Sequence, residues 1–310
     1  MKKIVIALGG NAIAGRDYSA AAQQQAVRTT INKLWPVFAS HNQLVIVHGN
    51  GPQVGNLLLQ QAAGSTSKNP AMPLDTAGAM TEGSIGYWLQ QAIDEAMLAH
   101  HDPRRAATVI TQTIVSANDP AFQHPTKPIG PFYSESEIAE QKRLHPGQVF
   151  VSDAGRGYRR VVASPAPMAI LEAPVIAKLA ASGEIPVVAG GGGIPVYQTE
   201  SGQLRGQAAV IDKDLAAAKV AADLEADELI ILTAVSHVYL HFGQKNQQAL
   251  TKVSAAQMQK YLQAGEFAAG SMAPKVKACL EFVSRSGRPA KIAALADADH
   301  LEQAGTVVIP

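Results

Sequence analysis

Residues 44–55 read LVIVHGNGPQVG, and the prediction of the fold starts from this stretch. Leu44–His48 is a continuous apolar run of strand length, which is typical of a strand buried on both faces of a parallel sheet. A glycine loop follows it directly, and Pro52 suits the first position of a helix. The stretch therefore predicts a buried strand, a tight turn and a helix whose positive end faces the turn.

Similar apolar runs alternate with helical patterns along the rest of the chain. The expected strands are Ile4–Leu8, Leu44–His48, Ala107–Gln112, Ile185–Ala189, Leu229–Thr233 and Lys291–Ala294. The expected helices lie near residues 19–40, 52–63, 83–100, 168–182, 214–224, 254–262 and 272–285. This alternation predicts an α/β fold with a mainly parallel sheet covered by helices on both faces. Binding sites in such sheets lie beyond the carboxyl ends of the strands.

The middle of the chain breaks the alternation. Prolines crowd the segment between Asn118 and Pro167, and residues 118–130 suit neither a helix nor a central strand. Short strands are expected near Val149–Ser152 and Tyr158–Val162. We interpret residues 116 to about 162 as a small insertion that projects from the sheet. Further on, residues 199–203 have the composition of a hairpin turn.

Composition limits the class of protein. The chain has 310 residues, of which 47 % are hydrophobic, so we expect about two domains with large cores. The net charge of +1 argues against a nucleic-acid or anionic-membrane partner. The single cysteine, Cys279, excludes an internal disulfide and suits a reducing compartment. The first apolar run is too short for a signal peptide, and no run approaches a transmembrane length, so we expect a cytoplasmic location.

Three glycine loops follow predicted buried strands. They contain Gly9, Gly10 and Asn11 in the first loop, Gly49, Asn50 and Gly51 in the second, and Gly191, Gly192 and Gly193 in the third. Glycine lets an anion approach the backbone N–H groups closely, and a helix that starts after the loop adds its positive end. Tight turns alone would explain one such loop, whereas three loops at three strand ends favour a phosphate site. Neither common nucleotide fingerprint is present.

Three lysines have unusual surroundings. Lys127 lies in the proline-rich insertion, whereas Lys213 and Lys275 lie in the first turns of predicted helices. A cation there opposes the helix dipole by about 0.3–1 kcal/mol, a cost that a bound polyanion would offset. Solvated surface lysines are the alternative. Asp212 and Asp214 flank Lys213, where they would cap the helix or orient the lysines and metal-bound water.

With these residues in view, the chain resembles the carbamate kinases of the amino-acid kinase superfamily, essentially from end to end. The matching motifs are ALGGNA (7–12), HGNGPQVG (48–55), IGYWLQ (85–90), NDPAF (118–122), PTKPIG (125–130), DAGRGYRRVVASP (153–165), GGGGIPV (190–196), VIDKDLAA (210–217), LTAV (232–235) and GSMAPKV (270–276). The glycine loops are shared across the superfamily. The motifs at 125–130 and 153–165 indicate carbamate kinases in particular.

The resemblance implies an open αβα sandwich around one mainly parallel sheet, with the insertion as a projecting subdomain. Residues 1–212 would bind carbamate or carbamoyl phosphate, and residues 213–310 would bind ATP or ADP. The implied reaction is reversible: ADP and carbamoyl phosphate give ATP and carbamate, which decomposes to ammonia and CO2. The implied assembly is a homodimer. Arginine, purine and other catabolic routes stay open as its metabolic setting.

The resemblance also implies roles for individual residues. It assigns catalysis to Lys127, Lys213, Asp214 and Lys275. The acceptor substrate would be bound through Gly9, Gly10, Asn11, Gly49, Asn50, Gly51, Gly191, Gly192 and Gly193. The nucleotide would lie near Lys213, Thr233, Ala234, Val235, Tyr239, Met272 and Lys275. No protein metal ligand is implied, because Mg²⁺ would be held mainly by the nucleotide phosphates and water.

Two alternatives remain at this point. The first is a kinase of the same superfamily whose acceptor is another small carboxylate or phosphate, which a substrate panel would distinguish. The second is a carbamoyl-phosphate or nucleotide sensor without catalysis, which would bind these ligands without turnover. The presence of Lys127, Lys213, Asp214 and Lys275 argues against the sensor.

Overall fold

An eight-stranded sheet forms the centre of the computed structural model, which describes residues 1–13, 17–152 and 157–310. Its order is β15-β17-β16-β12-β1-β2-β9-β3. The strands are β1 (Lys3–Leu8), β2 (Gln43–His48), β3 (Ala106–Thr108), β9 (Ile185–Val188), β12 (Glu228–Thr233), β15 (Lys252–Ser254), β16 (Ala290–Ala294) and β17 (Thr306–Ile309). All neighbours pair in parallel except β16 and β17. The prediction of a mainly parallel sheet is therefore confirmed.

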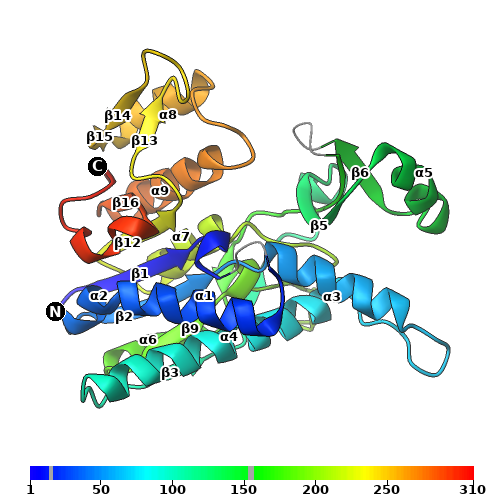
Figure 1. The fold of residues 1–310 in the computed structure, drawn as a ribbon, viewed down its shortest axis with the longest axis horizontal. Coiled ribbons are helices and arrows are strands. Elements are labelled where there is room, and N and C mark those ends of the chain that lie inside the picture. Colours follow the sequence, from blue (N-terminus) through cyan, green and yellow to red (C-terminus); the bar gives the residue numbers. More distant parts are fainter. Residues whose placement is uncertain (14–16, 153–156) are drawn as a thin grey trace.

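Helices cover both faces of this sheet (Figure 1). One face packs against α1 (Ala20–Lys33), α2 (Trp35–Ala39) and α4 (Leu74–Ala99). The other packs against α6 (Ala173–Ala181), α7 (Lys213–Asp223), α8 (Ala255–Gln263) and α9 (Met272–Ser286). Alternation along β1 shows why: Ile4 and Ile6 face the first layer, whereas Val5 and Ala7 face the second. Both faces are apolar, as a parallel sheet between two helical layers requires.

The insertion forms a separate projecting lobe, drawn in green in Figure 1. It contains β5 (Lys127–Tyr133), α5 (Glu135–Leu144), β6 (Val149–Ser152) and β7 (Tyr158–Val162), with the antiparallel order β5-β7-β6. Pro128 is tolerated because β5 is an edge strand. The lobe meets the body at α3 (Gly51–Ala63). If Gly55 carried a side chain, its Cβ would lie only 2.0 Å from Gly130 Cα, so the two backbones are in close contact. The strands expected at 149–152 and 158–162 are confirmed.

Two smaller sheets complete the described structure. The first has the order β11-β10-β4-β8, from β4 (Gln112–Ile114), β8 (Ala169–Ile170), β10 (Ile194–Gln198) and β11 (Leu204–Gly206). The antiparallel pairing of β10 with β11 confirms the hairpin turn at 199–203. The second sheet is the hairpin of β13 (Val238–Leu240) and β14 (Gln248–Leu250). Short 3₁₀ turns are η1 (Gly10–Ala12), η2 (Pro120–Phe122), η3 (Gly190–Gly192) and η4 (Leu295–His300).

Three predicted elements were wrong in extent. The strand expected at 107–112 is split between β3 and β4, which belong to different sheets, because the N–H of Thr111 bonds to Glu82 of α4. The helix expected at 168–182 begins only at Ala173, since residues 169–170 pair with β4 as β8. The helix expected at 83–100 begins earlier, at Leu74, directly after Pro73.

The single helix expected at 19–40 is divided into α1 and α2 at Leu34, with Pro36 in the first turn of α2. Helix α5 was not predicted, although Ser134 and Glu137 form a capping box at its start. None of the helices in the described ranges has the length and apolar character needed to cross a membrane.

Candidate active site

The three glycine loops meet at one edge of the central sheet. Strands β12, β1, β2 and β9 are neighbours, so their carboxyl ends lie side by side. A Cβ on Gly9 would lie 2.9 Å from the carbonyl oxygen of Leu232 in β12. A Cβ on Gly49 would lie 3.3 Å from Cδ of Lys213, so that lysine side chain crosses the second loop. The second loop therefore lies against Lys213, and the first loop lies against the end of β12.

The third loop has the tightest backbone. Gly191 adopts a φ of +67°, and a Cβ there would lie 2.2 Å from the side chain of Asn50 in the second loop. Gly192 and Gly193 also have positive φ values. These conformations favour glycine and bring the second and third loops into contact. Asn50 is buried and donates a hydrogen bond from Nδ2 to Thr81 Oγ1 at 2.9 Å.

The remaining loop residues are placed as follows. Gly10 lies in η1 after β1, and Gly51 starts α3, with open space beside the Cα of each. The backbone of Asn11 lies in η1, but its side chain is outside the described part of the structure. In the motif at 153–165, residues 153–156 also lie outside it.

Asp214 is the electrostatic centre of the site. It occupies the first turn of α7, is almost fully buried, and accepts hydrogen bonds from Lys213 Nζ and, at 2.8 Å, from Lys275 Nζ. Lys275 belongs to the first turn of α9, so two helix N-termini bring the three charges together. Burial alone would raise the pKa of Asp214, but the two ammonium groups hold this pKa well below its usual range.

With two ammonium groups and one carboxylate, the cluster of Lys213, Lys275 and Asp214 carries a net charge of +1. Burial lowers the pKa of Lys213, and the carboxylate of Asp214 opposes this shift. Both lysine side chains are mostly buried and line the same cavity, where a cation is poorly solvated. The arrangement suits a polyanion that completes the charge balance.

Lys127 reaches the same place from the projecting lobe. Its Nζ lies 2.6 Å from Asp212 Oδ2, and both residues line the cavity beside Lys213. Asp212 is also the N-cap of α7, because its Oδ1 accepts from the backbone N–H of Asp214 at 2.9 Å. All four residues that the sequence proposed for catalysis are therefore brought together.

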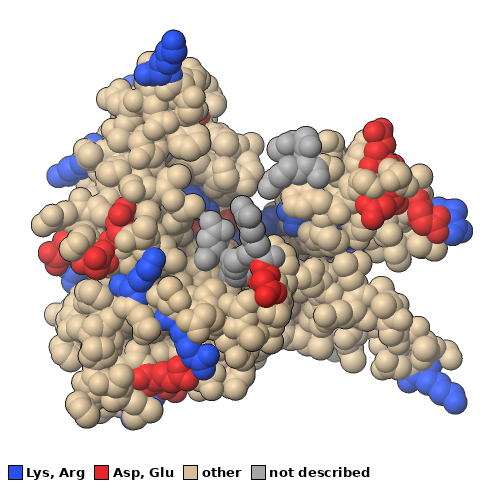
Figure 2. Space-filling view, in the orientation of Figure 1, with Lys and Arg blue, Asp and Glu red and all other residues tan. Residues whose placement is uncertain are grey.

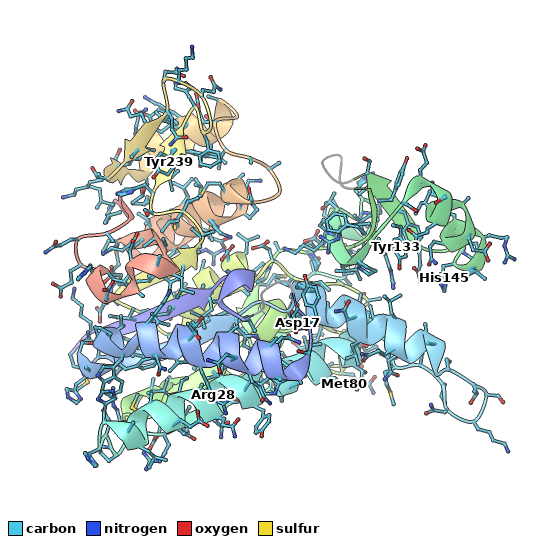
Figure 3. The ribbon with its side chains drawn as sticks, viewed as in Figure 1. Asp17, Arg28, Met80, Tyr133, His145 and Tyr239 are labelled. Carbon is cyan, nitrogen blue, oxygen red and sulfur yellow. The ribbon has the colours of Figure 1, made fainter. Side chains whose placement is uncertain are left out.

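A cavity of about 470 Å³ opens next to these charges. It is lined by every residue that the sequence proposed for the nucleotide: Lys213, Thr233, Ala234, Val235, Tyr239, Met272 and Lys275. Figure 3 shows Tyr239 in the part of the molecule that contains β13 and β14, and Tyr133 in the separate projecting lobe. The lining combines lysines and carboxylates with aromatic and apolar groups, a mixture that suits a nucleotide.

Sequence reasoning missed several residues of this cavity: Phe242, Glu266, Phe267, Ala268, Gly270, Ser271 and Pro274. Phe242 is 65 % exposed and its ring lies 5.9 Å from that of Tyr239, so the rim carries an aromatic pair. Phe242 lies in the β13–β14 connection, residues 266–271 lie in the α8–α9 connection, and Pro274 lies in the first turn of α9. Only the folded chain brings these segments together. The motif at 270–276 contained a signal for Gly270 and Ser271.

Metal-binding groups in the cavity are limited. Asp212 and Asp214 are paired with lysines, and Glu266 accepts from the backbone N–H of His241 at 3.3 Å. Within residues 1–13, 17–152 and 157–310, no group of three or more His, Cys, Asp or Glu side chains is arranged to hold a metal ion.

Comparison with known proteins agrees with this geometry. Residues 2–294 match the model of the amino acid kinase family. The carbamate kinase of Latilactobacillus sakei is 51 % identical, covering 99 % of this chain and 98 % of its own length. That of Lentilactobacillus hilgardii is 52 % identical, with 99 % and 97 % covered.

Solved structures show the same likeness. Carbamate kinase from Giardia lamblia bound to citric acid is 38 % identical, with a TM-score of 0.93 over 99 % of this chain and 98 % of that one. The same enzyme bound to AMP-PNP gives a TM-score of 0.90, with the same identity and coverage. Fold, glycine loops and relatives agree, and the chain belongs to the amino acid kinase family and, within it, to the carbamate kinases.

Proposed function

We propose that this protein transfers a phosphoryl group reversibly between ATP and carbamate. The observation that carries this proposal is the buried contact of Asp214 with Lys213 and Lys275, which line the 470 Å³ cavity, while Lys213 also lies against Gly49 of the second glycine loop. The naming of relatives at about half identity as carbamate kinases supports the same acceptor.

The chemistry needs no general base. Carbamate is already an oxyanion at neutral pH, and one of its oxygens attacks the γ-phosphorus of ATP. The bond between the γ-phosphorus and the bridging oxygen breaks, and ADP leaves with the electron pair. In the reverse direction a terminal oxygen of ADP attacks carbamoyl phosphate, and carbamate leaves. Because two anions must meet, catalysis consists of positioning and electrostatic stabilisation.

The charged residues divide this work. Lys213 crosses the second glycine loop and borders the cavity, so we assign it to the transferring phosphoryl group. Lys275, at the start of α9, is assigned to the nucleotide phosphates. Asp214 orients both ammonium groups without itself exchanging a proton, since its pKa is held low. Lys127 would approach the acceptor from the projecting lobe.

Mg²⁺ would neutralise charge on the nucleotide phosphates. The carboxylates of the cavity suit this arrangement, because Asp212 and Asp214 are already paired with lysines and phosphates and water would supply most ligands.

We also propose that the chain divides functionally at residues 212 and 213. The acceptor would lie on the glycine-loop side and the nucleotide beside α7 and α9. Because β1 pairs with both β2 and β12, one continuous sheet spans this division. A rigid sheet beneath both substrates would keep their reacting groups aligned.

A homodimer is the proposed assembly. Met80, Tyr87 and Leu98 are 42, 56 and 59 % exposed, and their spacing of 7 and 11 residues puts them on one side of α4. Figure 3 shows Met80 on this helix. An apolar stripe of this kind is typical of an interface.

Figure 2 shows positive and negative side chains interspersed on the visible face, in keeping with a cytoplasmic protein that has no nucleic-acid or membrane partner.

The proposal is tested in the direction of ATP formation, with a screen of phosphoryl donors. Purified protein is mixed with Mg-ADP and each of a set of phosphoryl donors: carbamoyl phosphate, acetyl phosphate, an acyl phosphate of an amino acid, and a nucleoside diphosphate. ATP formation is followed with luciferase. Turnover confined to carbamoyl phosphate supports the proposal. Turnover only with another donor favours a changed acceptor, and tight binding of carbamoyl phosphate without turnover favours a sensor.

A further inference from the structure

A buried carboxyl group holds the third glycine loop from behind. Glu82 of α4 is only 1 % exposed, and within the described residues no lysine or arginine forms an ion pair with it. Its Oε1 accepts from the backbone N–H of Gly190 at 2.8 Å, and its Oε2 accepts from the backbone N–H of Thr111 at 3.2 Å. One side chain thus joins the start of the loop to the break between β3 and β4.

The loop needs such an anchor because its backbone is strained. It begins with Ala189, a non-glycine residue with a left-handed φ of +48°. The N–H of Ala189 donates to Thr111 Oγ1 at 2.9 Å. Thr111 therefore contacts both Ala189 and Glu82. Strained residues of this kind cost on the order of 1 kcal/mol or more and persist only where the surroundings enforce them. Glu82 and Thr111 provide that enforcement.

The same turn of α4 also holds the second loop. Thr81, next to Glu82, accepts from Asn50, whose side chain lies against Gly191. Gly190 is enclosed on the other side by His48, since a Cβ there would lie 2.5 Å from His48 Nε2 and 2.9 Å from Glu82 Cγ. Two adjacent residues of one helix therefore contact both loops.

We propose that Glu82, with Thr81, is a positioning residue for the acceptor: it fixes the loops at 49–51 and 190–193 in the geometry that binds carbamate or carbamoyl phosphate. This inference rests on the proposed function, because it assigns these loops to the acceptor. Glu82 touches neither substrate. It acts through the backbone of the loop at 190–193, whose first N–H group donates to it.

The test compares three variants. Glu82→Met removes both carboxyl oxygens but keeps a side chain of similar size. Glu82→Gln keeps one carbonyl oxygen as an acceptor, and Glu172→Met is the matched control. Glu172 also accepts from a backbone N–H, that of Gln112 at 2.7 Å, and its side-chain partner is Gln112 rather than a residue of a glycine loop. Measurements are kcat, KM for carbamoyl phosphate, Kd for Mg-ADP, and amide hydrogen exchange of residues 189–193.

For Glu82→Met we expect kcat/KM for carbamoyl phosphate to fall by about 10²-fold, the usual cost of misplacing a site by about 1 Å. The Kd for Mg-ADP should stay within about twofold, because the nucleotide cavity does not include these loops. Glu82→Gln should lose much less kcat/KM than Glu82→Met does, and Glu172→Met should behave as wild type. Exchange at 189–193 should accelerate in Glu82→Met alone.

A folded Glu82→Met with wild-type kcat/KM overturns the proposal, and so does an equal loss of acceptor and ADP affinity. If Glu82→Met does not fold, Thr81→Val removes the contact with Asn50 and must show the same selective loss. If the wild type does not use carbamoyl phosphate, the proposed function fails. Exchange at 189–193 then still decides whether Glu82 anchors the loop.

Discussion

Lys127 and Asp212 are 85 residues apart in the chain, yet Lys127 Nζ lies 2.6 Å from Asp212 Oδ2. The first residue belongs to the projecting lobe, and the second caps the helix that carries Lys213 and Asp214. The lobe and the charged centre are therefore joined by one ion pair. Because this pair is partly exposed, its contribution to stability is small, on the order of 0–1 kcal/mol. The pair shows that Lys127 reaches the cavity beside Lys213 from the lobe.

The first prediction asks whether Lys127 contacts the substrate or only ties the lobe to Asp212. Lys127→Met should lower kcat/KM for carbamoyl phosphate by about 10²-fold, because it removes a cation aimed at the acceptor. Asp212→Asn breaks the same ion pair but keeps a side-chain oxygen that caps α7. It should retain most activity and the wild-type Tm. Equal losses of activity in the two variants would show that Lys127 acts only as a tether.

The second prediction concerns the charge balance around Asp214. Asp214→Asn leaves two buried ammonium groups facing each other and should destabilise the fold by about 3–5 kcal/mol. Adding Lys275→Met removes one of these charges and should recover part of the loss. Urea unfolding of both single variants and the double variant measures this coupling. Strictly additive free energies would contradict the assigned geometry.

The third prediction concerns the dependence of stability on pH. Burial raises the pKa of Glu82 from its ordinary 4.5 to about 8, and burial lowers the pKa of His48 from 6.5 to about 4. Between pH 4.5 and 6.5 the two groups oppose each other: Glu82 makes stability fall with rising pH and His48 makes it rise. From pH 6.5 to about 8, Glu82 is the one of these two groups that still contributes, so its contribution to stability should fall.

Urea unfolding at several pH values checks this sign. The wild type should lose up to about 1.4 kcal/mol per pH unit in that window relative to Glu82→Gln, which has no proton to release. A difference between the two proteins that does not change with pH would show that Glu82 is not protonated in the fold.

The fourth prediction concerns the single thiol. Cys279 is fully buried in α9, and burial raises its pKa well above the ordinary value. Since the thiolate is the reactive form, iodoacetamide should leave Cys279 unmodified and activity intact in the folded protein. In urea the thiol should react stoichiometrically. Mass spectrometry of both samples gives the result, and labelling of the native protein would contradict this placement.

Much of the fold was readable from local pattern. The continuous apolar runs at 4–8, 44–48 and 229–233 correctly predicted β1, β2 and β12, because strands buried on both faces carry no polar alternation. Cap and turn signals located the β10–β11 hairpin and would also have located α5. The strand predicted at 107–112 failed because Glu82, distant in sequence, takes the N–H of Thr111.

The charged centre was only partly predictable. Position at a helix start marked Lys213 and Lys275, and the order of strands brought the glycine loops together as parallel topology requires. The pairing of Lys127 with Asp212 depends on how the lobe folds back, which no local pattern encodes. The role of Glu82 was missed for the same reason, since a glutamate within a helix carries no sign of its burial.

The central claim is that Lys213, oriented by Asp214, stabilises a phosphoryl group passing between carbamate and ADP. The most direct measurement is the rate of ATP formation from Mg-ADP and carbamoyl phosphate for wild type and Lys213→Met. The account predicts wild-type turnover of about 1–100 per second and a fall of about 10²–10³-fold in kcat for the variant. Near-normal kcat in a folded Lys213→Met, or no ATP from the wild type, would contradict it.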